Sequence, residues 1–481
     1  MIKELFASWA GEPCLQQQQL TANGSNRMYF RLKGASQQCV AAVNADVREN
    51  EAFFYFASQL RQAGVRVPEV FAVSPDRTVY LQEDLGNTTL LQYLATKRSS
   101  GDDVTDEETS LYQQALTDLV TMQCRGRHFD FSHAYPRADF DRQSLQWDFN
   151  YFKYCFLKPM NIRFDEQALE TDFGRFIDYL LEGECDSFVY RDFQTRNIMI
   201  SAKQLAYIDF QGARRGAPQY DAASLLFSSK CRLTPEQRAS MLDFYTEQYW
   251  LQRHAQLPTP ADSRQFKQRY YAYVVARIMQ ALGAYGFRGL VEKKPLFAKS
   301  IPPAITNLRR VLAQSPLEVS LPELGRVWQQ LVCNEELEFG DERLSVKVFS
   351  FSYRREIPAD QSGNGGGFVF DCRALPNPGR FDQYRELTGL DAPVIEFLET
   401  KPEVQDFLTH VFALVSRSIE DYIQRGFQSL MINFGCTGGQ HRSVYCAEQT
   451  ARYIKENYDC RVVLRHIEQR AKKRREAIGD A

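Results

Sequence analysis

The chain of 481 residues lacks the sequence features of a secreted, membrane-spanning or disulfide-stapled protein. No stretch of roughly eighteen apolar residues runs without a charge, and the first residues contain no long apolar core of a signal peptide. Its 11 cysteines are scattered without a C-x-x-C pair, which excludes a disulfide framework or a structural zinc site and favours reduced thiols. We therefore expect a soluble, cytoplasmic protein that has no membrane partner.

The sequence also lacks a dominant charge and internal repeats. It has 58 Lys and Arg residues against 60 Asp and Glu residues, so the formal net charge is only -2. This balance gives the whole molecule no strong electrostatic attraction to nucleic acid or membrane, and any such affinity must be local. The length allows two or three domains, each large enough to bury its own core.

The most informative segment that is present runs from Tyr190 to Asn197 and is followed by Ile208-Asp-Phe210. In kinases an Asp takes the proton of the acceptor hydroxyl, and an Asn five residues later binds magnesium. A second Asp, after a short strand, holds the metal that bridges the ATP phosphates. Asp192, Asn197 and Asp209 have this spacing. The sequence therefore predicts phosphoryl transfer, with Asp192 as the catalytic residue and Asn197 and Asp209 as ligands of Mg²⁺.

The local pattern explains how these residues can converge. Asn197 to Ile200 has the composition of a short strand, Ser201 to Gln204 that of a turn, and Leu205 to Phe210 that of a second strand. A hairpin of this size brings Asn197 close to Asp209. The alternative is structural: Asp192 caps a turn and Asp209 ends a strand. A D-x4-N pattern alone would mean little, and the downstream Ile208-Asp-Phe210 segment is what favours the catalytic interpretation.

Periodicity along the chain predicts two domains of different class. Strands at Met28–Leu32, Cys39–Val43 and Val79–Gln82 and a helix at Glu51–Leu60 indicate a small sheet-rich lobe over residues 1–86, and a mainly helical lobe follows over 87–315. This order is typical of an α+β, protein-kinase-like bilobal domain. Residues 316–345 then form a bridging helix or linker, 346–470 alternate strands and helices as in a separate α/β domain, and 471–481 make a basic tail.

Residues 1 to about 325 resemble the aminoglycoside-phosphotransferase-like kinases, and most closely the bacterial kinases that phosphorylate N-acetylmuramate or N-acetylglucosamine at the anomeric hydroxyl. Four ordered blocks carry the resemblance: Gly24 to Arg31, Gln82 to Gly86, Tyr190 to Asn197, and Ile208 to Ala213 with Tyr220 to Leu225. It implies ATP and Mg²⁺ as cofactors, a sugar as the acceptor, Gly24 and Ser25 over the ATP phosphates, and Gln82, Glu83 and Asp84 as the hinge beside adenine.

One departure concerns the nucleotide site. The strand Cys39–Val43 has no lysine where many kinases place the residue that pairs the ATP phosphates with a helix glutamate, although Glu51 stands at a plausible helix position. Arg27, Arg31 and Lys33 are the nearby cations that could supply the missing charge, and the sequence does not choose among them.

The acceptor is weakly encoded. Sugar pockets combine aromatic faces with carboxylates and amides, and Trp147-Asp-Phe-Asn-Tyr-Phe152 has that composition. Asp148 is therefore a candidate sugar-contacting residue. The competing interpretation is an amphipathic helix whose aromatic residues form a core stripe.

A second candidate site lies at Phe434-Gly-Cys-Thr-Gly-Gly-Gln-His-Arg-Ser443, between an apolar strand and a helix. Gly438 and Gly439 let the backbone bend around a ligand, the helix N-terminus offers N–H groups, and Arg442 can bond two oxygens, so the segment predicts an anion site. Cys436 and Arg442 also satisfy the C-x5-R pattern of tyrosine phosphatases, in which a low thiol pKa supports covalent chemistry.

Residues 346 to about 470 closely resemble the C-terminal domain of the RNase adaptor RapZ. The matches include Phe370 to Pro378, Thr388 to Asp391 and Gly435 to Gln449. The resemblance implies a domain that senses glucosamine-6-phosphate and contacts small RNA and partner proteins, with a phosphosugar pocket built from Arg373, Thr437, Gly438, His441 and Arg442. The P-loop half of RapZ is missing, and Arg354-Arg-Glu356 replaces a Lys-His-Gly-like segment of the family.

Three functions remain open at this stage. The first is an amino-sugar kinase fused to a domain that binds a phosphorylated amino sugar, which could act as an effector. The second is a regulatory adaptor with a non-catalytic kinase scaffold, in which the basic run Arg470 to Arg475 binds the RNA backbone. A solvated helix end would have the same composition as this run. The third is a cysteine-dependent phosphatase that uses Cys436.

Overall fold

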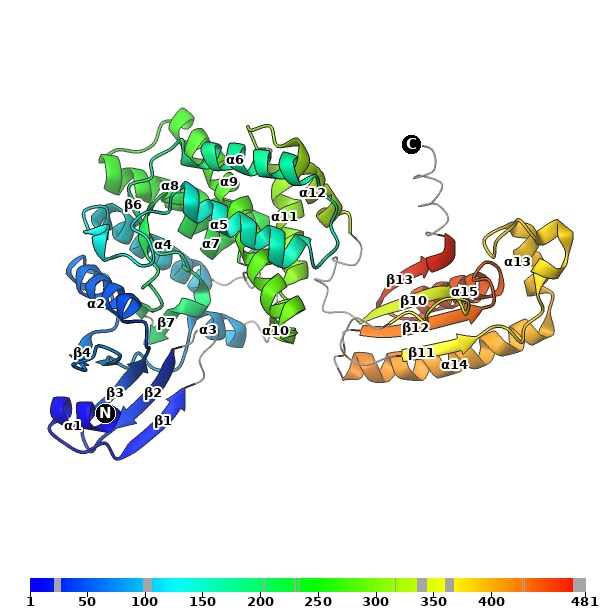
Figure 1. Cartoon of the computed structure of the whole chain (residues 1–481), viewed down its shortest axis with the longest axis horizontal. Coiled ribbons are helices and arrows are strands. Elements are labelled where there is room, and N and C mark those ends of the chain that lie inside the picture. The colour runs from blue at the N-terminus through cyan, green and yellow to red at the C-terminus, as the bar shows by residue number, and fades with distance from the viewer. Residues whose placement is uncertain are drawn as a thin grey trace. The chain divides into compact units, whose positions relative to one another are not determined.

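The computed structural model describes residues 1–20, 27–97, 106–201, 204–228, 231, 233–315, 317–334, 344–359, 367–425, 427 and 429–469. The chain divides into two compact units, Met1–Gly340 and Asp341–Ala481. Figure 1 shows the first as a small sheet joined to a large helical body and the second as a sheet with helices. The predicted kinase-like domain followed by a separate α/β domain is confirmed.

The first unit opens with an antiparallel sheet of five strands in the order β1-β2-β3-β5-β4. Helix α1 (Ile2–Ala10) precedes the sheet, and α2 (Val47–Gln62) follows β3. Successive residues of β3 point to opposite faces, because side chains alternate along a strand. Ala41 packs in the cluster that contains α1, and Ala42 packs in the large core with α2. The strands are β1 (Gln16–Leu20), β2 (Met28–Lys33), β3 (Gln38–Val43), β4 (Val70–Val73) and β5 (Val79–Gln82).

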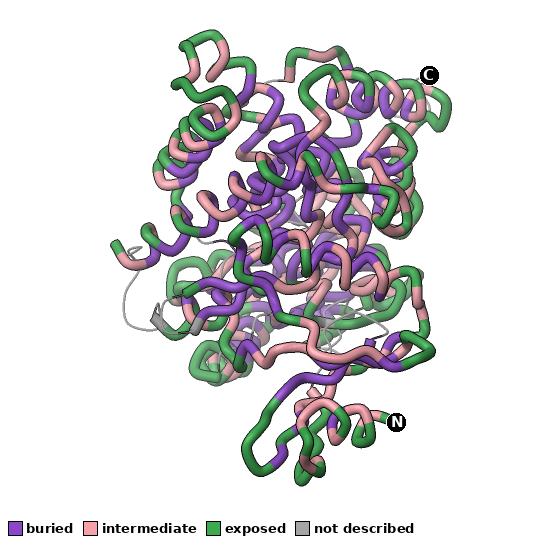
Figure 2. The backbone as a smooth tube through the Cα atoms, turned by 90° about the vertical axis from the view of Figure 1, so that its left-hand side faces the viewer, coloured by how far each residue is buried: buried purple, intermediate pink, exposed green. Residues whose placement is uncertain are grey.

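Helices build the rest of the first unit around one apolar core. Figure 2 shows buried residues running through the middle of these helices while exposed residues follow the outside. Local sequence fixes several helix starts: α8 and α9 each begin with a Thr capping box followed by Pro. The helices are α3 (Leu90–Lys97), α4 (Asp106–Gly126), α5 (Arg142–Phe152), α6 (Glu166–Leu181), α7 (Gln219–Leu226), α8 (Pro235–His254), α9 (Pro260–Tyr285), α10 (Pro295–Ala298), α11 (Ile301–Gln314) and α12 (Pro322–Val332).

Two short antiparallel ladders carry the central motif. In the first, β6 (Ser187–Val189) pairs with β9 (Arg214–Gly216), and in the second β7 (Ile198–Ser201) pairs with β8 (Gln204–Tyr207). The predicted hairpin is present, but its first strand is shifted by one residue and its second strand ends at Tyr207 instead of Phe210. Asn197 closes a 3-10 turn in which its N–H bonds the Gln194 carbonyl at 2.8 Å, and Asp209 leaves the strand with φ of 71°.

The segment 316–345 differs from the predicted bridge. Its helix α12 packs against α6 and α11 and buries Leu324, Val327 and Trp328 in the core of the first unit. Asp172 on α6 accepts the N–H groups of Glu323 and Leu324 at 2.7 and 3.0 Å, which ties the start of α12 to that helix. This helix belongs to the first unit because its apolar face is used there. Residues 335–343 lie outside the described residues.

The second unit is a parallel sheet of four strands in the order β11-β12-β10-β13. Helix α15 packs against β10, β12 and β13, and α14 packs against α15. The predicted alternation of strands and helices in this region is confirmed. The elements are β10 (Ser345–Ser352), β11 (Gly367–Asp371), α13 (Ala392–Glu399), α14 (Pro402–Gln424), β12 (Ser429–Cys436), α15 (Arg442–Asn457) and β13 (Arg461–His466). Among the described helices, none combines the length and apolar character needed to cross a membrane.

Candidate active site and anion loop

The structure brings together the three residues predicted to carry phosphoryl transfer. Nδ2 of Asn197 donates to the backbone carbonyl of Asp192 at 2.9 Å and to Oδ2 of Asp209 at 3.1 Å. The Ile208 N–H also bonds the Asn197 carbonyl at 3.0 Å. Because Nδ2 makes both side-chain bonds, Oδ1 of the same amide faces away from the Asp209 carboxylate. One asparagine therefore joins the loop that holds Asp192 to the strand end that holds Asp209.

Asp192 is held by a buried cation from a distant helix. Nη2 of Arg277, on α9, lies 2.9 Å from Oδ1 of Asp192, and the exposed fractions of the two side chains are 8% and 44%. Burial acts to raise the pKa of Asp192, but the positive charges of Arg277, Arg196 and Arg191 outweigh it and lower that pKa. The carboxylate is therefore ionised at neutral pH and can accept a proton from a hydroxyl. No local pattern pointed to Arg277, because it lies on α9, 85 residues along the chain from Asp192.

The pKa of Asp209 is shifted in the opposite direction from that of Asp192. Burial, followed by repulsion from Asp192, raises the pKa of Asp209. Nε2 of Gln211 donates to its Oδ1 at 3.0 Å. Its left-handed backbone conformation is uncommon outside glycine, and strain of this kind concentrates at functional sites. Two neighbouring carboxylates that repel each other favour a bound cation between them.

The donor set fits magnesium. Mg²⁺ prefers oxygen ligands and is usually held by one or two carboxylates together with substrate phosphates. Asp209 supplies such oxygens beside Asp192. Asn197 presents its Nδ2 to Asp209, so its Oδ1 would join the metal ligands once the amide turns over. Over the described part of the chain, no group of three or more His, Cys, Asp or Glu side chains could hold a metal ion, so an all-protein cage is not found there.

A buried carboxylate that sequence reasoning did not single out positions the catalytic loop. Asp221, on α7, accepts the N–H groups of Tyr190 and Arg191 at 2.6 and 3.0 Å and is fully buried. Burial raises the pKa of Asp221 to about 7, against the lowering effect of those two N–H groups and of Arg191. The segment from Tyr220 to Leu225 is one of the blocks that carry the family resemblance. No local pattern, however, predicts which backbone groups the Asp221 carboxylate binds.

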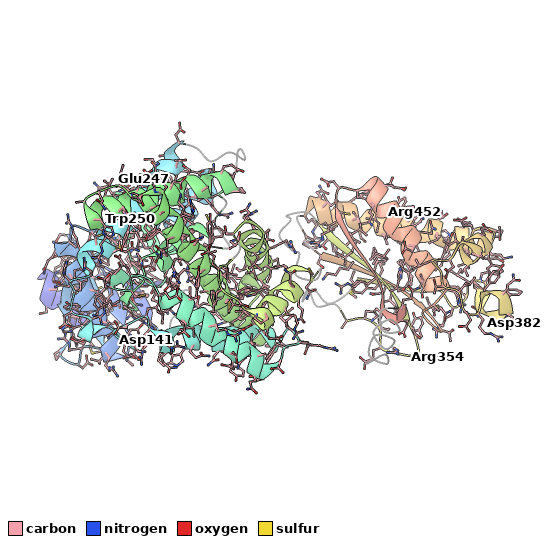
Figure 3. All side chains as sticks on the ribbon, turned by 90° about the horizontal axis from the view of Figure 1, so that it is seen from above. Asp141, Glu247, Trp250, Arg354, Asp382 and Arg452 are labelled. Carbon is pink, nitrogen blue, oxygen red and sulfur yellow. The ribbon has the colours of Figure 1, made fainter. Side chains whose placement is uncertain are left out.

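Asp148 has a partner other than the expected sugar. Its two oxygens accept bonds of 2.9 and 3.1 Å from Arg191, whose φ is 82° and which also donates to the Tyr220 hydroxyl at 2.9 Å. The exposed fraction of Asp148 is 13%. Its neighbours Phe149 and Phe152 are fully buried, so the aromatic residues of α5 are largely a core stripe. Asp141, labelled in Figure 3, caps the start of this helix by accepting the Ser144 N–H at 3.0 Å.

The helix glutamate predicted for the nucleotide site, Glu51, has a partner at the surface. Glu51 is exposed and forms an ion pair with Arg77, whereas Glu49, two residues earlier on α2, lies 3.4 Å from the buried Arg27. Residues two apart on a helix point to different sides, since each residue turns the helix by about 100°. The hydrophobic face of α2 directs Glu49 inwards and Glu51 outwards.

The predicted hinge lies at the end of β5. Asp84 is bonded to Arg31 at 2.5 and 2.8 Å and to Gln38 at 2.6 Å. Glu83 lies 3.8 Å from both Arg61 and Arg66, and its N–H bonds the Glu69 carbonyl at 2.8 Å. The carboxylates of this segment are thus engaged within the protein, and adenine contacts by Gln82, Glu83 and Asp84 remain a prediction. Gly24 and Ser25 lie outside the described residues.

The second candidate site is the loop between β12 and α15. Gly439 has φ of 66°, and a Cβ atom there would lie 2.6 Å from Cγ of Glu468 and 3.0 Å from the Ser352 nitrogen. At Gly438 a Cβ atom would meet nothing within 4 Å. The glycine at 439 is therefore required by a close approach to β10, whereas Gly438 borders open space. The N-terminus of α15 follows directly, and its first N–H groups have no partner within the helix.

The polar side chains of this loop have mostly internal partners. Arg442 is buried and donates to the carbonyls of Arg373 and Leu375 at 2.7 and 3.1 Å, and Nε2 of His441 lies 2.9 Å from the Tyr384 carbonyl. Arg373 is exposed, is paired with Asp371 at 2.6 Å, and covers the Tyr353 ring at 4.1 Å. The guanidinium of Arg442, which was predicted to bond two oxygens of an anion, bonds two backbone carbonyls instead and holds the neighbouring loop.

The geometry argues against the phosphatase reading of Cys436. Its side chain is 3% exposed, and its sulfur lies 3.1 Å from the Ser443 hydroxyl. A phosphatase nucleophile must reach its substrate together with an arginine that binds phosphate. Here the thiol is buried and Arg442 is bonded to the protein. Thr437, whose carbonyl accepts the Ser352 hydroxyl at 2.7 Å, and Gly438 border the outer side of the loop.

Three further features lie outside the two candidate sites: Arg354, the basic run and a surface pocket. Arg354, which is exposed at the edge of the second unit in Figure 3, is close in sequence to Arg355, which pairs with Glu468 at 3.2 Å. The basic run from residue 470 onwards lies outside the described residues. A polar surface pocket of about 860 Å³ contains none of the predicted site residues. It is lined by Arg175, Asp178, Tyr179, Glu182, Gln265, Gln268, Arg269, Glu318, Val319 and Ser320.

The first unit thus has a kinase-like fold with an Asp–Asn–Asp site at its catalytic loop. The chain belongs to the phosphotransferase enzyme family, whose model matches residues 16–256, half of the chain. Residues 344–470 match a second family model, the RapZ C-terminal domain.

The chain is also similar to curated relatives and to solved structures. A nucleotide-binding protein of Alkalilimnicola ehrlichii is 40% identical over 134 residues, which are 28% of this chain and 44% of that protein. One from Marinobacter nauticus is 33% identical over 195 residues, 38% of this chain and 62% of that protein. The chain therefore spans less than two thirds of the length of these relatives. A choline kinase from Cryptosporidium parvum aligns with a TM-score of 0.44 and 10% identity over 65% of this chain and 92% of its own.

Proposed function

We propose that the chain is an ATP- and Mg²⁺-dependent phosphotransferase that acts on a sugar hydroxyl. The acceptor we expect is an amino sugar such as N-acetylmuramate or N-acetylglucosamine, phosphorylated at the anomeric position. The observation that carries the proposal is the single amide of Asn197 that joins Asp192 and Asp209. Family membership supports the reaction class, and the four sequence blocks support the sugar acceptor.

Each residue has a role that follows from its surroundings. Asp192, kept ionised by Arg277, orients the acceptor hydroxyl and takes its proton. Asn197 and Asp209 would hold Mg²⁺, which would supply positive charge beside the nucleotide phosphates. Gly24 and Ser25, which lie outside the described residues, remain the residues predicted to lie over the phosphates. Arg191, anchored by Asp148, keeps the catalytic loop in place.

The test is a product assay with the full chain. Purified protein is incubated with Mg-ATP and a panel of amino sugars, and phosphorus NMR identifies the product, since coupling to the anomeric proton separates a 1-phosphate from a 6-phosphate. Asp192→Asn should lose activity by about 10²- to 10⁴-fold, the usual contribution of a general base. Asp178→Asn is the matched control, because that carboxylate is exposed and pairs with Arg142 on the surface. Turnover of Asp192→Asn at the wild-type rate would remove that residue from its role.

For the second unit we propose binding of a phosphorylated amino sugar at the loop that contains Thr437, Gly438 and Gly439, with Arg373 at its rim. The match to the RapZ C-terminal domain and the open space beside Gly438 support this assignment. Calorimetric titration with glucosamine-6-phosphate should show binding that Arg373→Ala weakens and Arg354→Ala does not. Equal affinity in both variants would exclude Arg373 from the site.

A second candidate function rests on the same match. In a regulatory adaptor the kinase unit would be a scaffold, and the protein would bind small RNA or a partner protein, with the tail from residue 470 contributing. This function predicts no ATP turnover and an RNA affinity that falls with salt and is lost when residues 470–475 are deleted. A cytoplasmic location is proposed for either function.

A further inference from the structure

We infer that Arg27 binds the nucleotide phosphates in place of the strand lysine that β3 lacks, with Glu49 on α2 as its carboxylate partner. The inference deepens the proposed function and rests on it. It assigns the task of an absent lysine to an arginine that enters the site from the neighbouring strand.

The first step concerns the space above β3. Ala42 is fully buried, lies on the face of the sheet that packs against α2, and is paired in register with Tyr29 on β2 and Tyr80 on β5. Its side chain is only a methyl group, so β3 supplies no cation on this face of the sheet. Any cation in this region must therefore come from another element.

Arg27 occupies this region. It directly precedes β2, its exposed fraction is 2%, and its Nη2 lies 3.4 Å from Oε2 of Glu49. Its charge interacts with Tyr80 and Tyr29, the two register partners of Ala42. The guanidinium carbon is 6.0 Å from the centre of the Phe53 ring on the inward face of α2. These contacts place the cation between the sheet and α2.

The same cation reaches towards the metal-binding side of the site. Phe53, which Arg27 covers, stacks on Phe210, the residue after Asp209, with ring centres 5.0 Å apart and planes at 13°. Arg27 therefore lies beside Glu49 and one aromatic ring away from the segment that carries Asp209, the aspartate predicted to bind Mg²⁺. A guanidinium can bond two phosphate oxygens at once.

The other nearby cations are committed elsewhere. Arg31 donates to Asp84 and to the Asn87 side chain at 2.6 Å, and Lys33 is exposed at the end of β2. Glu49 is itself held in position, since Nδ2 of Asn44 donates to its Oε2 at 2.8 Å. The choice among Arg27, Arg31 and Lys33 that the sequence left open is therefore made by burial and by the position of Glu49.

The experiment separates binding of phosphates from binding of the base. The full chain is titrated with Mg²⁺ plus a non-hydrolysable ATP analogue and, separately, with adenosine. Arg27→Gln should weaken affinity for the analogue by about tenfold or more, as expected for loss of a charge-assisted bond, and leave adenosine affinity unchanged. Arg27→Lys should recover part of the loss, and Glu49→Gln should weaken the analogue to a smaller extent. Arg77→Gln is the matched control, because Arg77 is exposed and faces outwards with Glu51.

The outcomes discriminate this inference from the proposed function. Wild-type affinity for the analogue in Arg27→Gln would overturn the inference while leaving nucleotide binding in place. An equal loss of analogue and adenosine affinity would also overturn it, since that pattern indicates a purely structural ion pair. If Arg27→Gln does not fold, Arg27→Lys and Glu49→Gln supply the same comparison. A wild-type chain that binds no Mg-nucleotide would refute the proposed function and this inference together.

Discussion

Replacing Asp148 by Asn tests whether this residue contacts sugar or holds the catalytic loop. The change keeps the shape of the side chain and removes its charge, so Arg191 loses its bidentate carboxylate. Removing one partner of a buried pair usually costs about 3–5 kcal/mol, and an exposed pair is worth at most about 1 kcal/mol. The pair is 13% and 16% exposed, and Arg191 keeps its bond to the Tyr220 hydroxyl. We therefore expect the free energy of unfolding to fall by about 2–3 kcal/mol.

The assay can be confined to the first unit. All 4 tryptophans of the chain, at positions 9, 147, 250 and 328, lie in that unit, so tryptophan fluorescence during urea unfolding reports on it alone. Asp139→Asn is the matched control, because the Asp139–Arg215 pair has the same chemistry but is 43% and 47% exposed. Its unfolding free energy should change by less than about 1 kcal/mol.

Turnover supplies the second half of this test. Arg191 directly precedes Asp192, so loss of its anchor should lower kcat and leave the KM for the sugar unchanged. A stability equal to that of the wild type together with a raised sugar KM would refute this reasoning and return Asp148 to the acceptor site.

Three further predictions concern charge and backbone geometry. Burial raises the pKa of Asp221 to about 7, so the folded chain keeps a proton that the unfolded chain loses above about pH 4. The contribution of this group to the free energy of unfolding therefore falls as the pH rises from about 4 through about 7, by up to about 1.4 kcal/mol per pH unit. In urea unfolding between pH 5 and 8, the free energy of unfolding of Asp221→Asn should fall less steeply with pH than that of the wild type. Arg277→Gln removes the charge that opposes burial at Asp192 and should move the acidic limb of the kcat/KM profile to higher pH, whereas an unmoved limb would count against the pair. Gly439→Ala should destabilise the second unit by about 1–2 kcal/mol through its left-handed backbone, measured by hydrogen exchange in β12 and α15, with Gly438→Ala as the milder control.

The catalytic motif was predictable because its information is local. Asp192 and Asn197 precede one short hairpin and Asp209 follows it, and strand periodicity with a turn between is enough to bring the last two together. The strand and helix pattern of both units was predictable for the same reason, since side-chain spacing along each element decides which face is buried. The exact strand ends were missed, because the 3-10 turn at Asn197 and the positive φ of Asp209 depend on contacts made across the hairpin.

Sequence patterns assigned Glu51, Asp148 and Arg442 to ligands, and in the structure each of them bonds another part of the protein instead.

The primary structure was sufficient to indicate a kinase-like domain and the alternation of helices and strands, because spacing along the chain carries both. Folding in three dimensions was needed to pair the buried Arg27 with Glu49, and to set Arg277 against Asp192 from 85 residues away. Such partners are chosen by burial and by which helix faces meet, and neither quantity is encoded in the spacing of a single segment.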